Sequence, residues 1–301
     1  MSYSLKFFNS ISIHNNEIYS ISIFPSGNII SVSSDKSIKI YNTNYIHIQK
    51  INNAHDDDIT YVSVKDENNF ITCSKDKNIK IWIKNNNNKY ILSQTISNAH
   101  NDIIIKVIYF IDEKIISCSW DETMKIWEKD NNNIFQSIIN FKHFDWVISI
   151  LLLEEKNILI STGRNGTKFF NCLNYENIFN INEACCNTNN GLQKIDNDRI
   201  IVGGGFDGII KIISISGKQI QKEIDNAFEC DGICVIEDKK IFIIGGWSYD
   251  IKIYNSNNYI CLQIIKKAHS HYINGIIELK NKNIVSYGYD KIIKIWKFNL
   301  E

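Results

Sequence analysis

The stretch SKDKNIKIW, residues 74–82, is the segment of this sequence that decides the fold. The related stretch SWDETMKIW follows at residues 119–127, and variants of the pattern recur along the chain at steps of 41 to 45 residues. The first and last positions of the seven copies, usually an Asp and an aromatic residue, are Asp35 with Tyr41, Asp76 with Trp82, Asp121 with Trp127, Asn165 with Asn171, Asp207 with Ile213, Ser248 with Tyr254, and Asp290 with Trp296. A period of this length predicts a chain built from seven copies of one supersecondary unit.

Two further positions keep the same register. A lysine lies two or three residues before the last position of every copy, as Lys39, Lys80, Lys125, Lys168, Lys211, Lys252 and Lys294. A histidine precedes the Asp position by 21 residues in four copies and by 22 in a fifth, as His14, His55, His100 and His269, and as His143. Agreement at several separate positions indicates true repeats.

With a His-rich loop, a short Ser-x-Asp turn and a terminal Trp at this period, the chain resembles the WD40 repeat family from about Leu5 to Trp296. The resemblance implies an all-β fold, a seven-bladed WD40-type β-propeller with four antiparallel strands in each blade. We expect residues 1–301 to form this single domain, because each repeat needs its neighbours to bury its apolar faces. The expected blades are approximately residues 10–51, 52–96, 97–140, 141–181, 182–224, 225–265 and 266–300.

The second unit shows the expected strands. Residues 60–64 and 70–74 alternate in character as strands do, residues 76–78 suit a turn, and residues 78–82 and 90–96 predict the third and fourth strands. The last unit ends on a third strand, whereas residues 4–8 precede His14 as other fourth strands precede their His. We therefore expect this N-terminal strand to pair with residues 293–296 and close the ring, which removes an open sheet edge.

Composition narrows the class of protein. Thirty-three basic residues balance thirty-three acidic ones, so no overall charge attracts nucleic acid. No apolar run reaches the length of a membrane helix, and the N-terminal residues lack the pattern of a signal peptide. The eight cysteines have no zinc-site spacing, which favours free thiols in the cytoplasm or nucleus. We expect no metal and no cofactor, and a monomeric domain that works within a complex of proteins.

Several polar residues could be mistaken for catalytic triads. The resemblance implies instead a structural relay in each blade, which runs from a Trp indole to a hydroxyl, then to a His and to the turn Asp. Carried over by position, the relay residues are His14, Ser33 and Asp35; His55, Ser74, Asp76 and Trp82; His100, Ser119, Asp121 and Trp127; and His269, Asp290 and Trp296. Tyr41 replaces Trp in the first copy, and Gly288 stands at the Ser position of the seventh. A nucleophile needs no copying around a ring, so we expect no catalytic residue and no enzyme.

The fourth, fifth and sixth copies depart from the pattern. Asn165 and Ser248 replace the Asp, and glycines replace the Ser as Gly163, Gly205 and Gly246. No His stands in the loops near Cys185 and Phe228. A count of seven blades is still favoured by the period and by the repeated lysine.

The residue just before the turn Asp is expected to project onto the face that carries the His loops, called the top face. Its seven occupants are Ser34, Lys75, Trp120, Arg164, Phe206, Trp247 and Tyr289. In this family the third and fifth positions after the His also reach that face, and here they include Glu17, Tyr19, Asp58, Thr60, Ile103, Ile105, Trp146, Ile148, Tyr272 and Asn274. Three tryptophans lie at these top-face positions, where the relay requires no indole: Trp120, Trp146 and Trp247.

Aromatic and Arg side chains dominate binding hot spots, which makes the top face the expected partner site. The residues predicted to bind a peptide or protein partner are Trp120, Trp146, Arg164, Phe206, Trp247, Tyr272, Tyr289, Lys75 and Tyr19. Arg164 and Lys75 could engage an acidic or phosphorylated group. One alternative is an aromatic cage for a methylated lysine, with Asp58 or Glu17 as its carboxylate. The other is a small ligand or substrate in the central opening.

Overall fold

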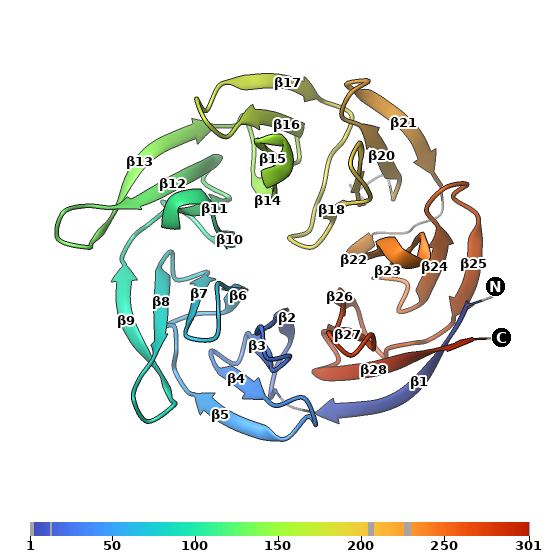
Figure 1. Cartoon of the computed structure of the whole chain (residues 1–301), viewed down its shortest axis with the longest axis horizontal. Helices are drawn as coiled ribbons and strands as arrows, with labels where there is room; N and C mark the ends of the chain where they lie inside the picture. Colours follow the sequence, from blue (N-terminus) through green and yellow to red (C-terminus); the bar gives the residue numbers. More distant parts are fainter. Residues whose placement is uncertain (1–2, 13, 204–207, 226–229, 301) are drawn as a thin grey trace.

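Seven four-stranded antiparallel sheets are arranged as blades around a central axis (Figure 1). The structure, a computed structural model, describes residues 3–12, 14–203, 208–225 and 230–300. In the first six blades the strands follow one another from the axis outward in chain order. The expected all-β, seven-bladed propeller is confirmed.

The bounds of the strands in the first four blades are as follows. Blade 1 holds β2 (Ile18–Ile23), β3 (Ile29–Ser33), β4 (Ile38–Tyr41) and β5 (His47–Ile51). Blade 2 holds β6 (Ile59–Val64), β7 (Asn69–Ser74), β8 (Ile79–Lys84) and β9 (Tyr90–Ile96). Blade 3 holds β10 (Ile104–Tyr109), β11 (Ile115–Ser119), β12 (Thr123–Lys129) and β13 (Phe135–Lys142). Blade 4 holds β14 (Val147–Leu153), β15 (Ile158–Gly163), β16 (Gly166–Asn171) and β17 (Asn177–Ile181).

The remaining blades complete the ring. Blade 5 holds β18 (Leu192–Lys194), β19 (Arg199–Val202), β20 (Ile210–Ser214) and β21 (Gln219–Ile224). Blade 6 holds β22 (Cys230–Ile236), β23 (Ile241–Gly246), β24 (Ile251–Asn255) and β25 (Cys261–Ile265). Blade 7 holds β26 (Ile273–Glu278), β27 (Ile284–Gly288), β28 (Ile292–Leu300) and β1 (Tyr3–Ser12). Three short 3₁₀ turns interrupt the connections, η1 (Ile111–Glu113), η2 (Glu154–Lys156) and η3 (Glu237–Lys239).

The hydrophobic core lies between neighbouring blades. Ile30 and Ile40 of blade 1 belong to the same buried cluster as Ile59 and Phe70 of blade 2. Both faces of a blade are therefore covered, which explains why its inner strands are rich in Ile instead of alternating with polar residues. No blade could bury these side chains alone, so the ring is stable only as a whole.

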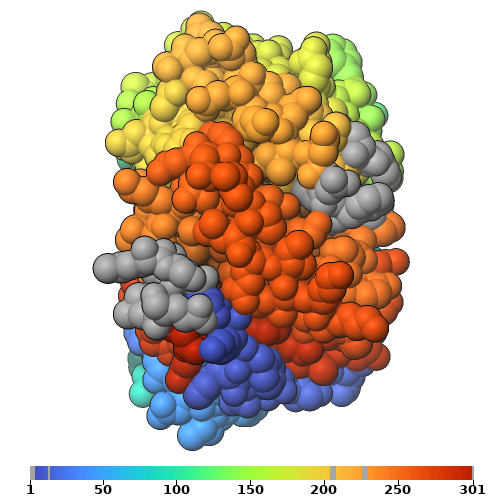
Figure 2. All heavy atoms as spheres, turned by 90° about the vertical axis from the view of Figure 1, so that its right-hand side faces the viewer, coloured from blue at the N-terminus to red at the C-terminus, as the bar shows by residue number. Residues whose placement is uncertain are grey.

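The ring is closed by the N-terminal strand. β1 pairs antiparallel with β28, with Phe7 opposite Trp296 and Ile11 opposite Ile293. The Leu5 side chain is 2% exposed and packs in the same cluster as Trp296. Figure 2 shows the blue N-terminal segment lying against the red C-terminal one on the side of the molecule. The predicted closure is confirmed, and the pairing is longer than predicted because β1 continues to Ser12.

The relay is present in blade 2, although its hydroxyl is not the predicted one. His55 Nδ1 lies 2.8 Å from Asp76 Oδ2, and His55 Nε2 lies 2.8 Å from Thr72 Oγ1. The Trp82 indole donates to the same Thr72 oxygen at 2.9 Å. Because the carboxylate can only accept, His55 carries its proton on Nδ1 and accepts from Thr72 through Nε2. Every polar atom of this chain of contacts has a partner.

The assignment of Ser33, Ser74 and Ser119 to the relay was therefore wrong. The hydroxyl that bonds both the His and the aromatic stands two residues earlier, as Thr72 in blade 2 and Ser117 in blade 3. Residues two apart in a strand point to the same side, and both positions carry Ser or Thr in these blades, so the pattern could not separate them. Ser74 accepts the backbone N–H of Asp76 at 3.0 Å and so holds the turn.

In the first and seventh blades, too, the relay hydroxyl stands two residues before the predicted position. Ser31 Oγ lies 2.9 Å from His14 Nε2 in blade 1. In blade 7 the Ser286 hydroxyl accepts from the Trp296 indole at 2.8 Å and lies 2.7 Å from His269 Nε2. Gly288 therefore leaves no gap, and the relay of blade 7 is complete.

Blade 4 is aligned one residue differently from the prediction. Phe170, not Asn171, occupies the place of the relay Trp, because Leu159 pairs with Phe170 as Phe70 pairs with Trp82. The hairpin is tighter, with Gly163 opposite Gly166 across a two-residue turn. His143 Nε2 still lies 2.9 Å from Ser161 Oγ, although no described carboxylate bonds its ring. The spacing of 22 residues in this copy arises before the turn, because His143 precedes its hydroxyl partner Ser161 by 18 residues whereas His55 precedes Thr72 by 17.

Candidate functional site

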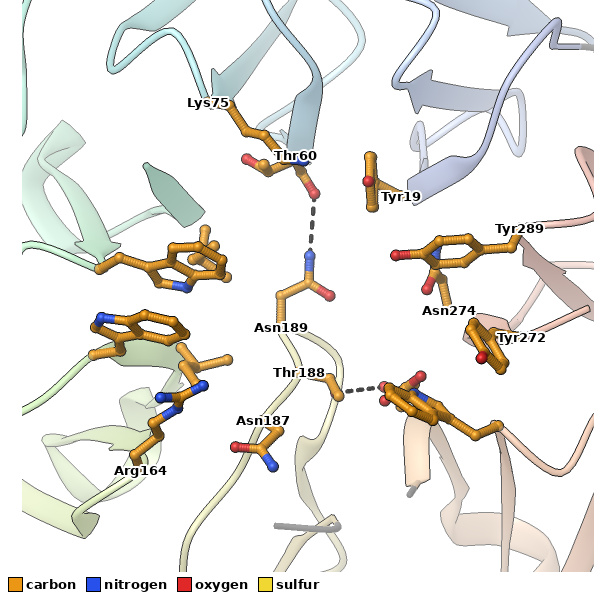
Figure 3. Close-up of a pocket in the computed structure, with 16 residues that line it drawn as sticks. Tyr19, Thr60, Lys75, Arg164, Asn187, Thr188, Asn189, Tyr272, Asn274 and Tyr289 are labelled. Atoms are coloured by element: carbon orange, nitrogen blue, oxygen red, sulfur yellow. Dashed lines mark hydrogen bonds between the residues drawn. The ribbon is translucent and has the colours of Figure 1, made fainter. Parts of the chain in front are cut away.

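A cavity of about 530 Å³ opens on the top face at the axis of the propeller (Figure 3). Its walls come from two sets of backbone positions, the turns between second and third strands and the first residues of the inner strands. The residues that line it are Tyr19, Thr60, Lys75, Ile105, Trp120, Trp146, Ile148, Arg164, Asn187, Thr188, Asn189, Asp231, Trp247, Tyr272, Asn274 and Tyr289. Six of the seven blades supply side chains, so only the closed ring assembles this cavity.

One wall is a stack of two indoles and a guanidinium group. Trp120, from the turn between β11 and β12, stacks on Trp146, which precedes β14, with ring centroids 4.0 Å apart and planes inclined by 7°. The guanidinium carbon of Arg164 lies 3.7 Å from the centre of the Trp146 ring. A cation at this distance is attracted by the negative face of the ring. The stack thus joins blades 3 and 4 and presents flat apolar surface to the cavity.

The opposite wall consists of four more rings. Trp247 stacks on Tyr272 with centroids 4.7 Å apart, and Tyr289 meets Tyr272 edge to face at 5.4 Å. Tyr19 meets Tyr289 edge to face at 6.1 Å. Burial and the nearby Asp58 carboxylate raise the pKa of Tyr19 to about 12, so its phenol stays protonated. Trp247 remains 49% exposed, which leaves much of its indole accessible from the top.

Lys75 is already paired. Its ammonium lies 2.7 Å from Asp58 Oδ2 and also lies over the Tyr19 ring, 5.5 Å from its centre. The Tyr19 hydroxyl lies 3.4 Å from the same Asp58 oxygen. These contacts lower the value of Lys75 as a ligand for an acidic group. They also occupy the Asp58 carboxylate that a methyl-lysine cage would need.

The floor of the cavity is a segment that the sequence patterns did not reveal. The connection between β17 and β18 turns toward the axis, and residues 187–190 lie across the channel (Figures 1 and 3). β18 has three residues, whereas the inner strand of every other blade has at least six. Blade 5 thus gives up the first part of its inner strand. We call residues 187–190 the plug.

Side chains and backbone groups from several blades hold the plug. Asn189 Nδ2 donates to the Thr60 carbonyl of blade 2 at 3.1 Å, and Asn190 Nδ2 donates to the Asn274 carbonyl of blade 7 at 2.9 Å. The Thr188 hydroxyl donates to the Asp231 carbonyl of blade 6 at 2.7 Å. Asn190 also forms a parallel bridge with Gly232. These contacts anchor the plug to blades 2, 6 and 7, so it forms part of the lining of the cavity.

Lys106 lies beneath the plug and does not line the cavity. Its ammonium donates to the Asn189 carbonyl at 3.0 Å and to Ser149 Oγ at 3.2 Å, and it lies 5.2 Å from the centre of the Tyr61 ring. Burial lowers the pKa of Lys106 to about 8. No carboxylate in the part of the chain that the structure describes contacts this buried ammonium, which makes it costly and indicates that its role is to position the plug.

The structure brings together most of the residues predicted to bind a partner. Trp120, Trp146, Arg164, Trp247, Tyr272, Tyr289, Lys75 and Tyr19 all line the cavity. Phe206 and the repeat position Asp207 lie outside the described residues. Ser34 is turned toward Glu17, whose carboxylate accepts from its hydroxyl at 2.5 Å, and neither residue lines the cavity. Asn187, Thr188, Asn189 and Asp231 were missed, because they belong to the fifth and sixth copies, whose loops carry no His to mark the positions that reach the top face.

The relay carboxylates and imidazoles are occupied by one another. Burial acts to raise the pKa of Asp76, but the hydrogen bond and electrostatic attraction of His55, together with the backbone N–H groups of Asp56 and Asn78, outweigh it and lower that pKa to about 2. Burial also lowers the pKa of His55, against the opposing effect of Asp76, so the imidazole is neutral. Because these groups are buried and bonded within the blade, they support the fold and face no ligand. Within the described ranges, no group of three or more His, Cys, Asp or Glu side chains could hold a metal ion.

Comparison with protein families agrees with the geometry of the blades. The family model described as WD domain, G-beta repeat matches residues 5–42, 47–82 and 91–128. These three matches cover the blades with the fullest relays in the N-terminal part of the chain. A comparison with curated proteins gave no match. In the part of the chain that the structure describes, no helix is long and apolar enough to cross a membrane.

Proposed function

Because the chain carries WD40 repeats in its N-terminal part and folds as a seven-bladed propeller, we propose that it is a non-catalytic interaction scaffold. It binds a segment of a protein partner in the top-face cavity. The WD40 fold is commonly used in this way, and the repeats here account for the buried polar residues without invoking chemistry.

The aromatic lining of the cavity is the observation that carries this proposal. Trp120, Trp146 and Trp247 are not part of any relay, yet all three face one cavity at the axis. Indoles bury a large apolar area at a small cost in side-chain entropy, so they provide much of the binding free energy at protein interfaces. Trp247 is exposed and Trp120 and Trp146 are partly buried, and a contiguous set of accessible aromatic rings on a folded domain indicates an interaction site.

A double substitution of Trp120→Ala and Trp247→Ala tests the proposal. The two indoles stand on opposite walls, so their removal should abolish capture of partners by the tagged protein and leave the fold intact. Leu173→Ala is a matched control, because Leu173 is 67% exposed in the turn between β16 and β17, away from the cavity. Proteins that bind the wild type and the control, but not the double variant, are partners at this site. Equal recovery by all three forms would contradict the proposal.

A modified peptide is the second candidate. The edge-to-face arrangement of Tyr19, Tyr272 and Tyr289 resembles the walls of a site for a methylated ammonium group. The ion pair between Lys75 and Asp58, 2.7 Å long, argues against a methyl-lysine site, because the Asp58 carboxylate is already paired with a cation. Binding tests with matched methylated and unmodified peptides separate this candidate from general segment binding.

A further inference from the structure

The amide groups at the floor of the cavity use only part of their hydrogen-bonding capacity. Asn189 and Asn274 each donate one hydrogen bond through Nδ2, to the carbonyls of Thr60 and Ile18. Neither Oδ1 atom accepts from another described residue. The Asn187 side chain lines the cavity and has no partner within the described ranges. The floor therefore offers acceptors and donors to a ligand, and all of them belong to uncharged groups.

The charged groups that the structure describes at the cavity balance. Lys75, Arg164 and Asp231 line it and Asp58 pairs with Lys75, so the formal charges of these four described residues sum to zero. Lys75 and Asp58 form an ion pair, and the guanidinium carbon of Arg164 lies 3.7 Å from the centre of the Trp146 ring. An ionic group that entered the space between the aromatic walls would lose its hydration. Without a clear excess of opposite charge to compensate this loss, an uncharged polar group is favoured.

The plug determines how far a ligand can enter. Its hydrogen bonds to Thr60, Asp231 and Asn274 tie it to blades on different sides of the channel. In Figure 3, Asn187 and Asn189 lie in the middle, between Arg164 on one side and Tyr19, Tyr272 and Tyr289 on the other. A side chain that enters from the top therefore passes between aromatic walls and ends against amides.

We propose that this floor recognises an uncharged primary amide, presented end-on by a glutamine side chain of the partner segment. The proposal rests on the proposed function and specifies what enters its cavity. The glutamine amide has two N–H groups for acceptors such as Asn189 Oδ1 and Asn274 Oδ1, and a carbonyl that can accept from Asn187 Nδ2. The aliphatic stem would lie between the rings, where a flexible apolar chain is well accommodated.

Four peptides of the form acetyl-Gly-Leu-Xaa-Leu-Gly-N-methylamide provide the first test, with Gln, Glu, Lys or Met at the variable position, so that only the Gln peptide carries a primary amide. Binding to the full chain is measured by isothermal titration calorimetry, supported by saturation-transfer NMR for weak complexes. The Gln peptide should bind roughly tenfold more tightly than the other three, which corresponds to about one well-formed hydrogen bond. Equal or tighter binding of the Glu, Lys or Met peptide, or binding of none, would overturn the proposal.

Asn187→Ala provides the second test. The substitution removes an amide that holds no other described residue, so the fold should be unaffected. The preference for the Gln peptide over the Met peptide should fall about tenfold. Asn87→Ala, in the exposed turn between β8 and β9, is the matched control and should leave the preference unchanged. A preference for the Gln peptide that Asn187→Ala leaves unchanged refutes the amide site.

The two proposals fail in different ways. If the Trp120 and Trp247 variant loses its partners while no peptide prefers Gln, the scaffold function stands and the amide inference falls. If that variant keeps its partners, the cavity is not the partner site. A Gln preference in the peptide tests would then describe a binding site for small ligands.

Discussion

Trp120 and Trp146 come from different blades, yet their indole rings stack with centroids 4.0 Å apart and planes inclined by 7°. Neither ring belongs to a relay, and both line the top-face cavity. The stack therefore has two consequences. It connects blade 3 to blade 4 at the surface, and it presets a flat apolar wall that a ligand can meet without reordering side chains.

The stack predicts a spectroscopic signal. Two parallel indoles at this distance are expected to couple in the near-ultraviolet circular dichroism, and Trp146→Ala should remove that signal. The free energy of unfolding should fall by about 0.5 to 1.5 kcal/mol beyond the loss of buried area. Trp247→Ala, which leaves this stack in place, serves as the control. A spectrum that is unchanged by Trp146→Ala would show that the rings do not stack in solution.

The geometry of the relay predicts that removal of the Thr72 hydroxyl lowers the free energy of unfolding more than removal of the Ser74 hydroxyl. Thr72→Val keeps the shape of the side chain but leaves the Trp82 N–H and the His55 Nε2 without a partner. It should lower the free energy of unfolding by about 2 to 4 kcal/mol, since two buried groups lose their bonds. Ser74→Ala removes only the contacts of the turn and should cost about 1 kcal/mol. Urea unfolding of both variants measures the difference, and a larger loss for Ser74→Ala would restore the original assignment.

Most of the fold could be predicted from the sequence because several copies keep the His, Asp and Trp positions at a constant spacing. The Asp76 and Trp82 positions fix a turn and a third strand, and β7, β8 and β9 lie within one or two residues of the predicted ranges. The hydroxyl of the relay could not be placed, because Thr72 and Ser74 are chemically similar and point to the same side of the strand. Blade 4 was aligned one residue off, since the tighter turn at Gly163 removes a residue.

The site was predicted where it depends on repeat positions and missed where it does not. Trp120 and Trp247 occupy the position before the turn Asp, so the period placed both in the cavity. The plug has no counterpart in other repeats, and nothing in the local sequence around Asn189 shows that it crosses the channel. Pairing between Lys75 and Asp58 depends on contacts between side chains that a repeat pattern does not specify.

Ring closure by β1 predicts a large effect of a short deletion. Removal of residues 1–10 exposes the edge of β28 and the cluster around Trp296 that Leu5 covers. The melting temperature should fall sharply, and Leu5→Ala alone should cost about 2 to 5 kcal/mol. Lys6→Ala changes an exposed side chain of the same strand and should have little effect. Differential scanning calorimetry measures all three, and an unchanged melting temperature for the deletion would contradict closure.

His143 predicts how stability depends on pH. Burial, reinforced by the charge of Lys168, lowers its pKa to about 3, whereas an unfolded His titrates near 6.5. Between these values the unfolded state binds more protons, so stability falls as the pH decreases through this window. His143→Gln should reduce the slope of unfolding free energy by up to about 1.4 kcal/mol per pH unit between pH 6 and 4. His47→Gln, at an exposed position, is the control, and identical slopes for all forms would refute this prediction.

Replacement of Lys106 is expected to affect the plug more than the stability of the fold. Lys106→Met removes a buried ammonium, so the free energy of unfolding should be unchanged or raised by about 1 to 4 kcal/mol. The Asn189 carbonyl keeps the bond from Ser149 but loses that from Lys106, which should loosen the plug. Hydrogen exchange of residues 187–191 should become faster while that of β10 stays slow. Strong destabilisation without faster exchange in the plug would contradict a positioning role.

Photo-crosslinking tests the central claim, that a partner binds in the top-face cavity, most directly. A benzophenone amino acid replaces Ile105, which lines the cavity but is not one of the predicted binding residues, in one variant and Leu173, outside the cavity, in the other. Each variant is illuminated with a partner identified by capture, and the crosslinked product is measured on denaturing gels. The account predicts a product from position 105 and little from position 173. A product from position 173 alone would place the partner elsewhere on the propeller and contradict the account.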